Sequence, residues 1–108
     1  MRKPNRNKTT EQKFLQDLVL LRNDPELLLE VIPFAEDGNI NAQYALGLIY
    51  AEGRGTNIDM VKSYVWLSRA IKQGDSDAQE LRNIIIEQMS EAEIATAERI
   101  LSCGQTLH

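Results

Sequence analysis

The stretch GNINAQYALGLIYAEGRGTNIDMVKSYVWLSRAIKQGDSDAQ, residues 38–79, contains one short pattern twice. The segment GNINAQ at 38–43 recurs as GDSDAQ at 74–79, thirty-six positions later. In each copy a glycine that can end one helix precedes an Asn or Asp that can cap the next. A repeat of this period with two helices per unit is typical of an α-solenoid, in which neighbouring hairpins bury a shared core. We therefore expect stacked helical hairpins whose closest contacts fall at small residues: Ala42, Gly47 and Ala70.

Capping residues and the spacing of apolar side chains predict six helices and no strand. These helices are expected over residues 10–22, 25–37, 41–52, 60–73, 76–89 and 91–102. Pro33 is expected to kink or split the second helix near Leu29, because proline removes a backbone donor. Ser90 and Glu93 form a predicted capping box for the last helix, which Gly104 closes.

The length of 108 residues and the 43% hydrophobic content indicate one globular domain. We expect it over residues 10–104, as a helical pair (10–37), a repeat (38–74) and a closing helical pair (75–104). Residues 1–9 are expected to form a disordered basic tail and residues 105–108 a frayed end. No apolar run reaches the ~20 residues of a membrane span, and the first residues lack the apolar stretch of a secretory signal. With a single cysteine, these features predict a cytoplasmic protein without a membrane partner.

The net charge of −4 is unevenly distributed. Residues 1–13 contain five basic residues and one acidic residue, whereas the remaining chain contains seven basic and fifteen acidic residues. The basic segment suggests a contact with nucleic acid or an acidic partner, or simply a solubilising terminus. The acidic remainder argues against a nucleic-acid surface on the folded part.

Residues with catalytic or metal-binding chemistry are sparse. The only histidine is His108, at the last position, so neither a His-His nor a Cys-His spacing for zinc exists. Cys103 is expected to be a small buried apolar residue, and a reactive nucleophile is the alternative. The glycines at Gly53 and Gly55 lack the Lys-Ser/Thr and the preceding strand of a phosphate loop. We therefore predict no enzyme, no metal, no cofactor and no small-molecule substrate.

One string is more specific than the rest: Gly53-x-Gly55, followed by Asp59 and then by Trp66. Together with its neighbours, this string resembles a Sel-one-like repeat, a relative of the tetratricopeptide repeat, over residues 35–74. The other residues that carry the resemblance are Gly38, Ala42, Gln43, Leu46, Gly47, Tyr50, Leu67, Ala70 and Gly74. Residues 74–103 resemble the closing unit of such proteins, and residues 10–34 match only as a generic helical pair. Ser63 stands where the family usually has alanine.

The resemblance implies an all-α fold: a short right-handed superhelix of about six antiparallel helices that works as an adaptor or scaffold. In this architecture the first helix of each unit lines a concave face. The expected protein-binding residues on that face are Asn41, Tyr44, Leu48, Ala51, Glu52, Glu80 and Ile84, with Arg54 exposed on the loop. For Leu48 and Ile84 a core position is the alternative. Trp66 and Tyr50 either stack a ligand or fill the space between paired helices.

The leading hypothesis is a non-catalytic module that binds another protein, as an adaptor, scaffold or regulator. An aromatic residue, aliphatic residues and acids on one concave face suit an apolar, partly basic peptide or helix. The alternatives are a homodimer formed through an exposed repeat face, a toxin-neutralising protein, a nucleic-acid contact through residues 2–13, and a small enzyme that acts through Cys103.

Overall fold

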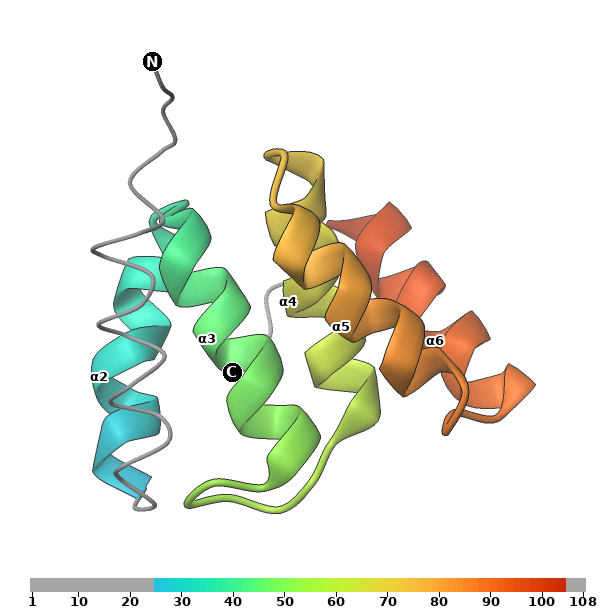
Figure 1. The fold of residues 1–108 in the computed structure, drawn as a ribbon, viewed down its shortest axis with the longest axis horizontal. Helices are drawn as coiled ribbons and strands as arrows, with labels where there is room; N and C mark the ends of the chain where they lie inside the picture. Colours follow the sequence, from blue (N-terminus) through green and yellow to red (C-terminus); the bar gives the residue numbers. More distant parts are fainter. Residues whose placement is uncertain (1–24, 105–108) are drawn as a thin grey trace.

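The computed structural model describes residues 25–104, and all regular structure within them is helical (Figure 1). This confirms the predicted all-α fold class for that part of the chain. The predicted helix over 10–22, the basic tail and the frayed end lie outside the described residues. The helices are α2 (Pro25–Glu36), α3 (Ile40–Glu52), α4 (Met60–Lys72), α5 (Ser76–Ile86) and α6 (Glu91–Cys103).

Each of α2, α3 and α4 packs against the next helix of the chain, whereas α6 packs against α4 (Figure 1). Helix α3 lies between α2 and α4, and α4 also contacts α5 and α6. The first copy of the repeat comprises α3 and α4, and the second begins with α5. Helix α3 contacts α5 directly, so the first helices of the two copies lie side by side. The buried apolar residues form one core. Helix α2 contributes Leu27, Val31 and Ala35 to it, which recur every four positions and therefore lie on the face of α2 that packs on α3.

The two copies of the repeated pattern have the same local structure. Gly38 and Gly74 both adopt the left-handed backbone region, with φ of +96° and +100°. The side chain of Asn39 then accepts a hydrogen bond from the amide of Ala42 (2.9 Å), and Asp75 Oδ1 accepts from the amide of Ala78 (3.2 Å). Each glycine therefore reverses the chain, and each cap opens the next helix, as the sequence predicts.

Helices α3 and α4 approach closely at Gly47. A Cβ atom at this position would lie 2.3 Å from Cδ2 of Leu67, so the absence of a side chain sets the spacing of the two helices. The hydroxyl of Ser63 donates a 2.7 Å hydrogen bond to the carbonyl of Gly47 across the same contact. Ala42 and Ala70 are also fully buried, as expected for small residues at helix contacts.

Most helix ends lie within one residue of the prediction, but two features differ more. Helix α2 continues through Pro33 and is not split, because Leu27, Val31 and Ala35 hold one face of it against the core on both sides of the proline. Helix α5 ends at Ile86 rather than at Met89. The amides of residues 87–89 bond three positions back instead of four, which tightens the chain into a turn. Ser90 follows with an extended backbone, and its side chain caps α6 by accepting from the amide of Glu93.

Candidate functional site

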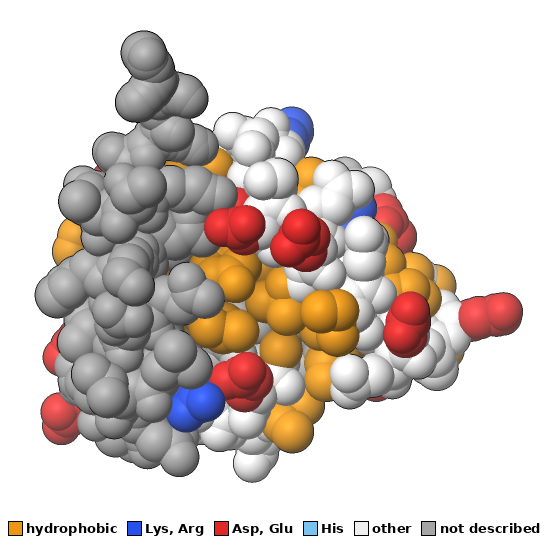
Figure 2. Space-filling model, in the orientation of Figure 1, with side chains coloured by type: hydrophobic (Ala, Val, Ile, Leu, Met, Phe, Trp, Pro, Cys, Tyr) orange, Lys and Arg blue, Asp and Glu red, His pale blue; other side chains and the backbone are white. Residues whose placement is uncertain are grey.

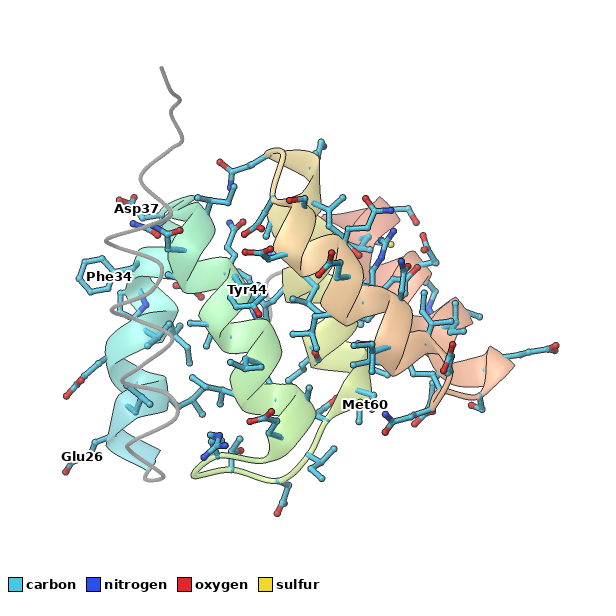
Figure 3. The ribbon with its side chains drawn as sticks, in the orientation of Figure 1. Glu26, Phe34, Asp37, Tyr44 and Met60 are labelled. Atoms are coloured by element: carbon cyan, nitrogen blue, oxygen red, sulfur yellow. The ribbon has the colours of Figure 1, made fainter. Side chains whose placement is uncertain are left out.

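A groove runs between the first helices of the two hairpins, α3 and α5. Its volume is about 320 Å³, and the described residues that line it are Tyr44 from α3 and Asp77, Glu80, Leu81 and Ile84 from α5. Figure 3 shows the Tyr44 side chain directed from α3 toward α5. The four residues of α5 follow a spacing of three, four and seven positions, which places them on one face of that helix.

The groove combines an apolar surface with an acidic edge. Ile84 is 55% exposed, although the neighbouring Ile85 on α5 is only 2% exposed in the core. Figure 2 shows hydrophobic side chains gathered in the middle of this face with acidic side chains around them. The α5 surface therefore keeps one isoleucine in contact with water, beside the two exposed carboxylates of Asp77 and Glu80.

Tyr44 is the polar group at the base of the groove. Burial, and after it the negative charges of Asp77, Asp75, Glu52 and Glu80 in that order of importance, raise the pKa of its hydroxyl to about 12. The residue is only 8% exposed. At neutral pH the hydroxyl is therefore protonated and lies in the field of four carboxylates.

The structure brings together three of the seven concave-face residues expected from sequence: Tyr44, Glu80 and Ile84 all line the groove. Asn41 and Leu48 are 6% exposed, and Leu48 belongs to the core cluster, so both offer little surface. Ala51 is half-buried. Glu52 is exposed at the end of α3, where it accepts a 2.7 Å hydrogen bond from Nε of Arg54.

Two lining residues, Asp77 and Leu81, were missed by the sequence analysis. Helical spacing is the signal that could have identified them. Glu80 and Ile84 were predicted to face the partner, and residues 77 and 81 lie on the same face of the helix as 80 and 84. The expected list followed the positions beside the repeat signature on the first helix, and so it emphasised α3.

The aromatic pair singled out in the sequence fills the interior. Trp66 is fully buried and Tyr50 is 2% exposed, so neither presents a face for a ligand. Each ring also has a cation over its face: Arg69 lies 4.7 Å from the centre of the Trp66 ring, and Lys62 lies 5.3 Å from that of Tyr50. Of the two interpretations, the structure favours packing between paired helices.

Hydrogen bonds among the ends of α2, α3 and α4 position α3, which forms one wall of the groove. The side-chain amide of Gln73 donates to the carbonyl of Gly38 (3.0 Å) and to Oε1 of Gln43 (2.9 Å). Nε2 of Gln43 in turn donates to the carbonyl of Ala35 (3.1 Å). These three bonds connect the end of α4 to the start of α3 and the end of α2. They hold α3, and with it Tyr44, in a fixed register.

A second network holds α5. Arg82 donates to the hydroxyl of Ser68 on α4 (2.8 Å) and lies 5.1 Å from the centre of the Tyr64 ring. Tyr64 donates to the carboxylate of Glu98 on α6, and burial, followed by this hydrogen bond, raises the pKa of Tyr64. Because Arg82 lies on the side of α5 away from the groove, the network orients the face that carries Leu81 and Ile84.

Cys103 is exposed at the end of α6, which corrects the expected buried position. The helix buries Ala97 and partly buries Ile100 and Leu101, and these residues define a face that does not include Cys103. Residues 25–104 contain no group of three or more His, Cys, Asp or Glu side chains placed to hold a metal ion. None of the helices in this range is long and apolar enough to cross a membrane.

Comparison with known proteins gives one partial similarity. The chain is 35% identical over 71 residues to the alginate biosynthesis protein AlgK of Azotobacter vinelandii. The aligned region covers 66% of this chain and 15% of the length of AlgK. No known protein family matches the sequence, and no solved structure matches it. The similarity to AlgK and the all-helical fold together favour a helical-repeat protein.

Proposed function

We propose that this chain is a non-catalytic protein-binding module and that its partner binds in the groove between α3 and α5. The observation that carries the proposal is Ile84, a large aliphatic side chain that is 55% exposed next to a buried tyrosine and two carboxylates. An apolar centre with a polar edge is the usual composition of a protein-binding surface.

The proposed architecture is a short right-handed superhelix of repeats with the groove on its concave face. Supporting it are the matching caps at Asn39 and Asp75 and the side-by-side contact of α3 with α5. Stacked hairpins of this kind form extended surfaces that bind segments of other proteins. The partial similarity to AlgK supports a scaffold or adaptor role. A part in alginate biosynthesis is not proposed, because the aligned region is 15% of that protein.

The chemistry of the groove supports binding more than catalysis. A tyrosine whose pKa is about 12 holds its proton at neutral pH, so Tyr44 is a poor general base there. Its hydroxyl instead suits a hydrogen bond to the partner. The carboxylates of Asp77 and Glu80 are exposed. Catalytic acids are usually buried in a cleft, and these two side chains are not.

Self-association is a second candidate, supported by a different surface. Leu29 and Phe34 on α2 are 68% and 62% exposed, and Figure 3 shows Phe34 directed away from the other helices. A hollow of about 470 Å³ lies beside Phe34, lined by Pro33, Glu36 and Asp37. The two acidic side chains count against a symmetric pair, because both copies would bring negative charge to the same contact.

A photo-cross-linking residue in place of Ile84 tests the proposed function. The full chain with the probe at 84 is irradiated in its native cell, beside a chain with the same probe at the exposed position Ser102 on α6. The proposal expects one dominant adduct from position 84 and none from Ser102. An adduct of the chain with itself through a probe at Phe34, with none at 84, would favour self-association instead.

A further inference from the structure

Helix α3 is buried along ten consecutive residues, 41–50, and therefore on every side. A helix of this kind needs neighbours all round, because an uncovered side would leave its residues in contact with water. The described helices that pack on α3 are α2, α4 and α5. Contacts of individual residues show which side of α3 each of them covers.

The three neighbours lie at different positions around α3. Helix α4 approaches at Gly47, where Leu67 leaves no room for a side chain. The end of α2 lies beside Gln43, whose side-chain amide donates to the carbonyl of Ala35. Helix α5 lies on the side of Tyr44, across the groove (Figure 3).

Asn41, Ala45 and Leu48 form another side of α3. They are spaced four and three positions apart and are 6%, 0% and 6% exposed. At about 100° per residue, all three point roughly 100–160° away from both Gly47 and Gln43. This side of α3 is therefore turned away from α4 and from the end of α2.

Helix α5 is nearest to this side but does not close it. The groove of about 320 Å³ lies between the two helices, and Ile84 on the α5 wall of the groove is 55% exposed. A helix that leaves such a groove beside Tyr44 cannot also bury Asn41 and Ala45, which lie farther round α3. The burial of these residues therefore calls for a fourth neighbour.

The segment before α2 has the pattern and the length that this neighbour needs. Residues 10–22 lie outside the described residues, and their sequence predicts a helix with Phe14, Leu15, Leu18 and Val19 on one side. Such a helix is about 20 Å long, which matches the 13 residues of α3.

The connection to α2 determines how this segment would lie. Only two residues separate position 22 from Pro25, where α2 begins, and so short a connection makes the two helices antiparallel neighbours. Helix α2 is itself antiparallel to α3, so its start is level with the end of α3 (Figure 1). The segment would then run parallel to α3, with Leu18 near Leu48 and Leu15 near Ala45.

We infer that residues 10–22 form a helix that packs across Asn41, Ala45 and Leu48, so that the chain's own N-terminal segment covers this side of α3. The inference does not depend on a partner protein. It does limit the proposed binding surface: Asn41 and Leu48, which the sequence predicted to contact a partner, contact the chain itself. The partner is confined to the strip between Tyr44 and Ile84.

The reactivity of a cysteine placed on this side, in the full chain, tests the inference. Ala45→Cys is combined with Cys103→Ser, and its rate of alkylation by a maleimide is compared with that of the exposed Cys103 in the unchanged chain. The thiol at position 45 should react at least about 100-fold more slowly. Adding Leu15→Ser with Leu18→Ser should raise its rate at least about 10-fold. Leu48→Cys gives the same measurement at a second position.

Two controls separate local exposure from general unfolding. Lys13→Ser with Gln16→Ser places two serines at the same spacing on the opposite side of the predicted helix, and it should change the rate at position 45 less than about 2-fold. Ala97→Cys places the thiol at a buried position of α6. Its rate should rise much less than the rate at position 45 when Leu15 and Leu18 are changed to serine.

Three results would overturn the inference. Fast alkylation at positions 45 and 48 in the chain with an unchanged N-terminal segment would show that this side of α3 is open. Slow alkylation that Leu15→Ser with Leu18→Ser leaves unchanged would show that α2, α4 and α5 bury it without help. Equal increases at positions 45 and 97 would give the segment a general stabilising effect instead of a cover over α3. None of these results involves Ile84, so the proposed function is tested separately.

Discussion

Gly47 of α3 and Leu67 of α4 touch so closely that a Cβ atom on the glycine would lie 2.3 Å from Cδ2 and 2.5 Å from Cγ of the leucine. Neither atom can move far, because Leu67 is fully buried in the core. The distance between the two helices of the first hairpin therefore depends on this glycine. Since α3 carries Tyr44, the same contact determines where one wall of the groove lies.

Gly47→Ala is predicted to destabilise the protein despite the better helix propensity of alanine. The better helix propensity of alanine adds up to about 1 kcal/mol to the free energy of unfolding, whereas overpacking a fixed core contact lowers it by about 1–3 kcal/mol. We expect a net loss of about 1–2 kcal/mol in the free energy of unfolding, measured by urea denaturation. Leu67→Val should cost less in the Gly47→Ala background than alone, and additive losses would mean that the two residues do not clash.

Ser63→Ala is predicted to cost about 0.5–1.5 kcal/mol, because it removes the buried hydrogen bond from Ser63 to the carbonyl of Gly47. The control is Ser102→Ala, since Ser102 is exposed and its hydroxyl, among the described residues, bonds to carbonyls of its own helix. Thermal unfolding of the two variants gives the comparison. Equal melting temperatures for both would show that the cross-helix bond adds nothing.

Two substitutions of Trp66 should distinguish the contribution of its packing from that of hydrogen bonding by its indole. Trp66→Ala is predicted to lose about 3–5 kcal/mol and to unfold much of the chain. Trp66→Phe should lose markedly less, because the buried indole Nε1 has no hydrogen-bond partner among the described residues and its removal breaks no bond. Circular dichroism during denaturation measures both. Similar losses for the two variants would contradict the packing interpretation.

Tyr44 gives a prediction for alkaline pH. Its folded-state pKa of about 12 exceeds the ordinary value of 10.0, so the folded chain holds this proton more tightly than the unfolded chain. The resulting stability is fully present below pH 10 and is lost between pH 10 and 12, by up to about 2 kcal/mol. In Tyr44→Phe the decline over this interval should be smaller, while stability at pH 7 changes little. An identical alkaline decline in both proteins would show that the Tyr44 hydroxyl is not buried among charges.

The sequence was sufficient for features that depend on local chemistry. The glycines at Gly38 and Gly74 require left-handed backbone, and Asn39 and Asp75 follow them as caps, so the repeat and its turns were predictable. The close contact at Gly47 was also predictable from the spacing of small residues. In each copy of the repeat the glycine and its cap are adjacent in the sequence, whereas Leu67, the partner of Gly47, was not identified.

Features that depend on packing between helices were not predictable. The bond from Ser63 to the carbonyl of Gly47 joins residues sixteen positions apart, at a position where the family usually has alanine. The early end of α5 depends on the extended conformation that Ser90 needs in order to cap α6. The roles of Asp77 and Leu81 became evident only when α5 was seen beside α3, because their helical face points to the groove rather than to the core.

The central claim is that a partner protein binds through the groove between α3 and α5. Its most direct test is the affinity of the captured partner for Ile84→Asp, measured by titration calorimetry beside Ser102→Asp as a control of equal charge. The account predicts at least a 10-fold weaker affinity for Ile84→Asp, an unchanged affinity for Ser102→Asp and equal melting temperatures for both. Equal affinities for the two variants would contradict it.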